Sequence, residues 1–166
     1  MPLKSIGKEF FMTCEPQFTL DELYITPFTL RRLYDEEGNA RYVALQRNTA
    51  PSGVRLLDEL LLGISRGTES CVSFRKRHGI TRSKLSALVE LLTGLTCDEF
   101  FLHFRLRMAD ELLRYTPLSI GEVAARSGFG THTNFCVACQ NHYKCTPAAR
   151  RRSLRGKNDV NRFRLA

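Results

Sequence analysis

Histidine and cysteine, side chains that often bind transition metals, are concentrated in one stretch of this sequence, GFGTHTNFCVACQNHYKCTP. His132, Cys136 and Cys139 follow one another at helical spacing, which places them on one face of a helix. A fourth ligand from Cys145 or His142 would complete a zinc site. The same letters also fit a glycine-containing turn followed by a helix, which is typical of DNA-binding proteins. The stretch thus indicates either a metal site or a DNA-contacting helix.

The elements that would position this stretch are predicted by helical periodicity between Val54 and Ser153. Ser, Thr and Pro residues that begin helices, and glycines that end them, divide this region into seven helices. We expect these helices at 54–64, 70–78, 81–92, 96–115, 119–127, 131–143 and from 146 onward. The sequences TCDE and SIGE match the capping box, in which a hydroxyl and a Glu each accept from a backbone N–H group. This region is therefore predicted to be entirely α-helical.

Two parts of the helical region resemble each other when the chain is displaced by 50 residues. Thr81 then aligns with Thr131, and Thr96 aligns with Thr146. Each copy consists of a short helix, a turn that contains glycine and a longer capped helix, which is the outline of a helix-turn-helix. The predicted fold is thus mainly α, a seven-helix double helix-turn-helix of the homeodomain-like kind.

The first 50 residues have a different composition from the rest of the chain. They contain many aromatic residues and are too apolar for a disordered arm. Within them, LRRLYDEEGNARYVAL predicts a short β-hairpin, with Glu37-Gly38-Asn39 as its turn. We therefore divide the chain into an N-terminal segment at 1–50, a double helix-turn-helix domain at 51–153 and a basic tail at 154–166.

Positive charge is unevenly distributed along the chain. The net charge is +8, and seven Lys and Arg residues lie between Arg150 and Ala166 beside a single Asp. A basic end on a nearly neutral body favours binding to polyanions, above all nucleic acid. The alternative interpretation of this end is a solvated, disordered tail.

The composition and the motifs missing from the sequence predict a cytoplasmic protein that is not an enzyme. Of the 166 residues, 43% are hydrophobic, and no apolar run approaches the roughly 18 residues of a membrane helix. The N-terminus has no pattern typical of a signal peptide, so the six cysteines are expected to be reduced thiols. The sequence also contains no glycine-rich phosphate loop, metalloprotease motif or serine elbow.

The segment LSIGEVAARSGFGTHTNFCVACQNHYKCTPAARRR resembles the second helix-turn-helix of AraC/XylS-type transcription regulators. The matching positions are Ile120, Val123, Ala124, Gly128, Phe129, Phe135, Tyr143, Thr146 and Pro147. Upstream, GITRSKLSALVELLTGLTCDEFFLHFRLRMADELL resembles the first helix-turn-helix and the connecting helix, including Arg105 and Leu106. The resemblance covers about residues 54–153. It implies a DNA-binding transcription regulator of bacterial type with two recognition helices.

The resemblance also bears on the choice between a metal site and a DNA-contacting helix. Cys139 occupies a position where the family usually has a core phenylalanine, and it falls in a stripe with Phe135, Ala138 and His142 that we expect to face inward. Free cysteine behaves as a small hydrophobe in a core, and metal binding would compete with this packing. We therefore expect a DNA-contacting helix and no metal or other cofactor.

The residues expected to face outward from the two recognition helices are candidates for base contacts. They are His132, Thr133, Cys136 and Val137 in the second copy, and Arg82, Ser83 and Ser86 in the first. His132 and Thr133 can form hydrogen bonds with bases, Val137 can contact thymine methyl groups, and Arg82 suits guanine. Many members of the family carry an arginine where this chain has Val137 and Ala87.

A second set of residues is expected to bind phosphates, which positions a protein on DNA without contacting the bases. The candidates are Thr81 and Thr131 at helix N-termini, Arg75, Lys76 and Arg77, and Arg150, Arg151 and Arg152. If about six phosphates are neutralised, affinity should fall about a thousandfold between 50 and 200 mM salt.

The predicted connecting helix, 97–115, has a length that suits double-stranded DNA as the partner. At 1.5 Å per residue it would span about 28 Å, and one turn of B-DNA spans about 34 Å. A single chain could therefore place its two recognition helices in successive major-groove segments of one duplex.

A second hypothesis assigns the helix-turn-helix a scaffolding role with little sequence-specific DNA binding. In this interpretation residues 1–50 bind RNA polymerase or another regulator, and the small apolar Ala87 and Val137 favour it. No pattern in the sequence indicates an oligomeric state.

Overall fold

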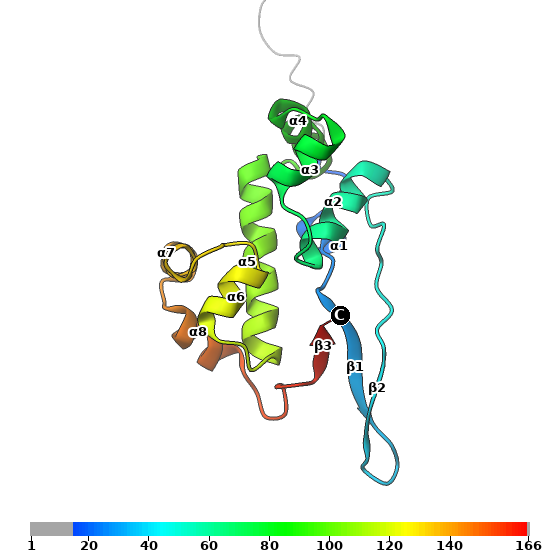
Figure 1. Cartoon of the computed structure of the whole chain (residues 1–166), viewed down its shortest axis with the longest axis vertical. Coiled ribbons are helices and arrows are strands. Elements are labelled where there is room, and N and C mark those ends of the chain that lie inside the picture. The colour runs from blue at the N-terminus through cyan, green and yellow to red at the C-terminus, as the bar shows by residue number, and fades with distance from the viewer. Residues whose placement is uncertain (1–14, 166) are drawn as a thin grey trace, which may run out of the picture.

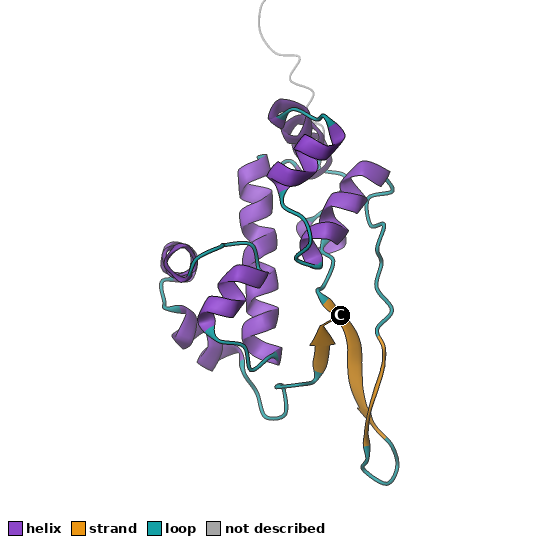
Figure 2. Ribbon diagram, in the orientation of Figure 1, coloured by secondary structure: helices purple, strands orange, loops and turns teal. Residues whose placement is uncertain are grey.

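The computed structural model describes residues 15–165, in which eight helices and three strands occur. In chain order they are α1 (Leu20–Leu23), β1 (Phe28–Tyr34), β2 (Ala40–Ala44), α2 (Arg55–Ser65), α3 (Cys71–His78), α4 (Arg82–Thr93), α5 (Cys97–Tyr115), α6 (Ile120–Arg126), α7 (His132–Tyr143), α8 (Pro147–Leu154) and β3 (Phe163–Leu165). The seven helices predicted from the sequence are α2 to α8, so the mainly α fold is confirmed. Figure 2 shows the strands forming a small sheet at the lower right, with the helices to the left of it and above it.

Hydroxyl side chains at the N-caps begin the helices from α3 to α8, whereas the N-cap of α2 is Val54. Thr96 and Ser119 form capping boxes with Glu99 and Glu122, as predicted. Thr146 caps α8, which has proline at its first position. These contacts satisfy backbone N–H groups that have no partner within the helix, and each typically contributes about 1 kcal/mol. The helix boundaries are thus determined mainly by local sequence.

The long helix α5 forms the axis of the molecule (Figure 1). It runs unbroken for 19 residues and buries residues along its whole length, among them Phe100, Phe104, Met108 and Leu112. The helices α6, α7 and α8 lie on one side of it, whereas α1, α2 and the sheet lie on the other, and α4 packs near its N-terminal end. One helix therefore holds both helix-turn-helix units.

The predicted β-hairpin is present, and a strand from the far end of the chain extends it. Strands β1 and β2 pair antiparallel, with Gly38 in the left-handed region at φ +85° in the turn. Strand β3 pairs antiparallel with the other edge of β1, which gives the order β2-β1-β3. The last residues of the expected basic tail thus form part of the sheet.

Side chains from the N-terminal segment attach the sheet to α5. The hydroxyl groups of Tyr24 and Thr26 both donate hydrogen bonds to the carboxylate of Glu111, at 2.9 and 2.7 Å. The ring of Phe28 is buried and packs edge-on against Tyr115, with ring centres 6.0 Å apart. These contacts make the sheet a fixed extension of the helical body.

The helices between residues 15 and 165 are all too short or too polar to cross a membrane.

Candidate nucleic-acid interface

The helices α4 and α7 are structural copies of each other at a displacement of 50 residues. Both are preceded by a threonine N-cap, Thr81 or Thr131, whose hydroxyl accepts from the backbone N–H three residues later. The pattern of buried, half-buried and exposed residues is identical from 81 to 90 and from 131 to 140. The internal repeat inferred from the sequence therefore corresponds to two equivalent surfaces.

On α7, most of the expected base-contacting residues are free to meet a ligand. His132 and Thr133 are exposed, and the side chain of Val137 is 54% exposed. Cys136 is half-buried, and its sulfur lies 3.7 Å from Nδ1 of His132. The outer face of α7 thus combines an imidazole, a hydroxyl and apolar groups, which suits contact with base edges and thymine methyl groups.

On α4, the equivalent face is exposed but carries only one long polar side chain. Ser83 and Ala87 are exposed and Ser86 is half-buried. Arg82 donates to the carboxylate of Asp98 at 2.6 Å in an ion pair whose two side chains are largely exposed. Because exposed ion pairs contribute little free energy, Arg82 can exchange this partner for a DNA acceptor at small cost.

The inward stripe predicted for α7 is confirmed for Phe135 and Cys139, but it is wrong for His142. Phe135 and Cys139 are fully buried, and desolvation raises the pKa of the Cys139 thiol to about 12. His142 is exposed, with its ring 5.1 Å from that of His103 on α5. His142 lies in the last turn of α7, which ends at Tyr143, and the buried residues of this helix are Phe135 and Cys139 alone.

The structure separates the residues that resembled a metal site. Cys139 is fully buried, whereas His132 is exposed and Cys136 is half-buried beside it. Within residues 15–165, no three or more His, Cys, Asp or Glu side chains are grouped as a metal site requires. The cysteines in this range are all free, and Cys14 lies outside the described residues.

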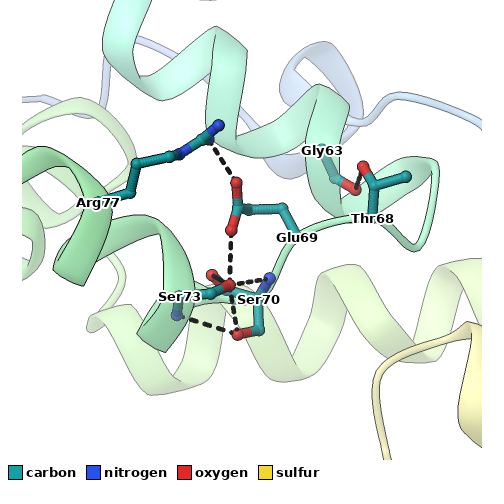
Figure 3. A network of polar contacts seen from close by, with 6 residues as sticks. All are labelled: Gly63, Thr68, Glu69, Ser70, Ser73 and Arg77. Carbon is teal, nitrogen blue, oxygen red and sulfur yellow. Dashed lines mark hydrogen bonds and ion pairs between the residues drawn. The ribbon is translucent and has the colours of Figure 1, made fainter.

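The basic residues of α3 have different surroundings. Lys76 is exposed and Arg75 is half-buried. Arg77 forms an ion pair with Glu69, which also accepts a hydrogen bond from Ser73 at the start of the same helix (Figure 3). Arg77 thus joins the two ends of α3, so Lys76 and Arg75 are better placed for a phosphate.

The arginines that begin the C-terminal segment also differ in their availability. Arg150 donates two hydrogen bonds to Asp110 on α5, at 3.0 and 2.6 Å, and stacks over the ring of Tyr143. Its hydrogen bonds to Asp110 raise its pKa further above the usual range. Arg151 donates to the backbone oxygen of Leu118, whereas Arg152 is exposed. Arg150 therefore has a structural role, and Arg152 is the residue of this run that is open to DNA.

The structure adds one arginine to the predicted site. Arg105, on α5, lines a surface cavity of about 400 Å³ together with Arg75 and Arg82. Its side chain also lies beside Gly128, in the turn before α7. No residue of the described range forms an ion pair or hydrogen bond with its guanidinium group. The sequence placed Arg105 in the connecting helix, but only the fold shows that it lies between the two helix-turn-helix units.

Comparison with known proteins identifies this part of the chain. Residues 75–153 match the family model of a helix-turn-helix domain. This match and the relative described below support an AraC/XylS-type regulator. The resemblance found in the sequence is thereby confirmed, and a domain of this type binds DNA rather than catalysing a reaction.

Two similar proteins come from bacteria. The HTH-type transcriptional activator RhaR of Cronobacter sakazakii is 28% identical over 102 residues, which cover 60% of this chain. This chain spans 36% of the length of that relative. A solved AraC-type transcriptional regulator from Chromobacterium violaceum is 25% identical, with a TM-score of 0.49, and is matched over 63% of this chain and 96% of its own.

Proposed function

We propose that this protein is a transcription regulator that binds specific sequences of double-stranded DNA through two AraC/XylS-type recognition helices. The observation that carries the proposal is the pairing of α4 and α7, two helices with the same exposed face that are joined by one unbroken helix. At 19 residues α5 spans about 28 Å, close to one turn of B-DNA at about 34 Å.

In the proposed complex, α7 provides most of the base contacts. His132 and Thr133 form hydrogen bonds with base edges, while Val137 and Cys136 contact thymine methyl groups. On α4, Arg82 is the residue best suited to a guanine, with Ser83 and Ser86 as shorter polar contacts. The loss of one good base contact typically costs about 1–3 kcal/mol.

Phosphate contacts would flank and separate the two base-contacting surfaces. Arg75, Lys76 and Arg105 lie between the helix-turn-helix units or beside the first, and Arg152 lies beyond the second. The backbone N–H groups at the starts of α4 and α7, after Thr81 and Thr131, provide further donors to anions. The strand between two successive major grooves would then pass the cavity lined by Arg75, Arg82 and Arg105.

The decisive experiment is selection of binding sites from random duplexes, followed by affinity measurements by fluorescence anisotropy at several salt concentrations. We expect an enriched motif with two parts about one helical turn apart. The variant His132→Ala should lose about tenfold in affinity and relax the preference at one position. The variant Arg105→Ala should weaken all sequences alike and reduce the salt slope by about one unit.

A matched control is Arg55→Ala, because this side chain is 92% exposed on α2, away from α7, and the same charge is removed. It should leave both affinity and salt slope unchanged. If no motif is enriched and the His132 and Arg105 variants bind like the control, the proposal is wrong. The alternative would then be favoured, in which the helix-turn-helix is a scaffold and the N-terminal segment binds RNA polymerase or another regulator.

A further inference from the structure

The outer edge of β2 presents backbone groups that have no partner within residues 15–165. Strand β2 pairs only with β1 in the order β2-β1-β3. The backbone hydrogen bonds from Leu45 to Thr29 and from Asp35 to Asn39 show that the odd-numbered residues of β2 face β1. The N–H and C=O groups of Ala40, Tyr42 and Ala44 therefore point away from the sheet.

This edge has few of the features that protect free strands from pairing. Proteins usually cover such edges, interrupt them with proline or a bulge, or place charged side chains along them. Strand β2, ARYVA, has no proline, and the irregular register of the sheet lies on the β3 side instead. Ala40 and Ala44, on either side of Tyr42, are exposed and small. Another strand can therefore approach along the whole of β2.

A second copy of the same strand fits this edge in one register. With the two-fold axis at Tyr42, each Ala40 lies opposite the Ala44 of the other copy, and all three outward residues are used. Such antiparallel pairing would form about six hydrogen bonds between the copies. A shift of one residue would place outward groups opposite inward ones, and a shift of two would leave part of the edge unpaired.

Charge complementarity also favours a second copy over an unrelated strand. The tip of the hairpin carries Asp35, Glu36 and Glu37, all exposed. In the register centred on Tyr42, this acidic tip extends past the end of the other copy's β2, to the position of Arg47. The guanidinium group of Arg47 donates a hydrogen bond to the backbone oxygen of Thr26 at 3.0 Å, and neither Arg47 nor Arg66 forms an ion pair with a described acidic residue. The acidic tip would supply the missing negative charge.

We propose that two copies of this chain associate along β2 to form a continuous six-stranded antiparallel sheet. Figure 1 shows α5 between the sheet and α7, so the pairing leaves the outer face of α7 uncovered. The interface is isologous, because the same residues of both copies form it. A five-residue edge buries less surface than a standard interface of about 1,600 Å², so the association is weak and concentration-dependent.

The test measures the dimerisation constant of the whole chain by sedimentation equilibrium from about 1 µM to 1 mM, a range that covers weak complexes. The variant carrying Ala40→Lys with Ala44→Lys places like charges opposite each other and should weaken association at least about tenfold. The variant carrying Ala40→Lys with Ala44→Glu places opposite charges together and should associate at least as tightly as the wild type. Both positions are exposed, so circular dichroism should show the same fold for all three proteins.

The results also separate this proposal from the proposed DNA-binding function. The inference is wrong if the wild-type chain stays monomeric throughout this range of concentration. It is also wrong if the variant carrying Ala40→Lys with Ala44→Lys has the same dimerisation constant as the wild type. The proposed register is wrong if the variant carrying Ala40→Lys with Ala44→Glu associates more weakly than the wild type. Binding of a single short site by each monomer, measured by anisotropy at nanomolar protein, should be the same for all three proteins, because no residue of β2 belongs to α4 or α7.

Discussion

Asp159 is the single acidic residue of the basic C-terminal segment, and it is buried with 5% of its surface exposed. Its carboxylate accepts a hydrogen bond from Nε of Arg114 on α5 and another from the backbone N–H of Gly156, both at 2.8 Å. These bonds fold the chain back from α8 toward β3. The hydrogen bond from Arg114 and that from Gly156 also lower the pKa of Asp159 below its ordinary value.

We predict that Asp159 stabilises the protein in a pH-dependent way. A lowered pKa in the folded state gives stability that is present above the ordinary pKa and is lost as pH falls through the folded-state value. Asp159→Asn should therefore reduce the free energy of unfolding by about 1–3 kcal/mol at pH 7. The difference from the wild type should shrink below about pH 4, as the wild-type carboxylate becomes protonated. Urea unfolding from pH 7 to pH 3 measures both effects.

Glu111 provides an internal comparison, because burial raises its pKa whereas hydrogen bonds lower that of Asp159. A raised pKa contributes stability that is lost as pH rises through the folded-state value. At low pH, where Glu111 is protonated, Glu111→Gln and the wild type should have similar free energies of unfolding. At neutral pH the variant should be the more stable of the two, because it removes a charge that is costly to bury.

A difference between Asp159→Asn and the wild type that stays constant from pH 7 to pH 3 would contradict the assigned role of the Asp159 carboxylate.

Residue roles could be predicted from the sequence only where the residue acts locally. The exposed candidates on α7 followed from helical spacing. In contrast, Arg150 binds Asp110 on α5, 40 positions away, and Arg114 on α5 binds Asp159, 45 positions away. Charge density alone indicated a phosphate-binding or solvated tail. The fold instead directs Arg150 and Arg155 inward, where Arg155 donates to the backbone oxygens of Leu113 and Thr116.

The equivalent helices α4 and α7 end in different residues that have the same backbone conformation. Gly94 ends α4 at φ +69°, and Lys144 ends α7 at φ +58°. The left-handed conformation is strained for a residue with a Cβ atom, typically by about 1–2 kcal/mol, but costs glycine nothing. Glycine at position 144 would adopt this conformation without the strain that lysine has there.

We predict opposite effects when the two C-caps are exchanged. Lys144→Gly should raise the free energy of unfolding by about 0.5–1 kcal/mol, because the hydrogen bond from Nζ to Asn141 is on the surface and contributes little. Gly94→Lys should lower it by about 1–2 kcal/mol, and the new Cβ would also lie only 3.0 Å from Pro16. Differential scanning calorimetry should show melting temperatures that move by about 2–4 °C per kcal/mol in these two directions. Shifts of the same sign would refute this explanation.

Short elements escaped prediction for a physical reason. Helix α1 has four residues and β3 has three, too few for periodicity to indicate a helix or a strand. Strand β3 exists because Phe163, Arg164 and Leu165 meet the free edge of β1. Such pairing across more than a hundred residues is a product of the tertiary fold.

In the whole molecule, Phe163 joins the two ends of the chain. Its ring lies 5.6 Å from that of Phe28 on β1 and 4.7 Å from that of Tyr115 at the end of α5, measured between ring centres. This cluster attaches the hairpin to the helical body. Because Phe163 is half-buried, its truncation should cost less than the full penalty of a core phenylalanine.

We predict that Phe163→Ala destabilises the sheet without destabilising α4 and α7. The free energy of unfolding should fall by about 2 kcal/mol, and amide exchange in β1 and β2 should increase while that of α4 and α7 stays the same. Hydrogen exchange with mass spectrometry resolves these segments. Val72→Ala is a suitable control, since this side chain is 53% exposed on α3. Faster exchange throughout the chain would show that the sheet and the helices unfold together.

The sequence by itself determined the helices, their caps, the repeat and the family of the helical domain, because these depend on contacts within about one or two helical turns. Threonines at 81 and 131 begin α4 and α7 wherever the rest of the chain lies. Only the tertiary structure decided that Arg105 faces the space between the two units, that Arg150 is bound to Asp110, and that β3 closes the sheet. These features join residues far apart in the chain, so they follow from how the helices pack around α5 rather than from any local pattern.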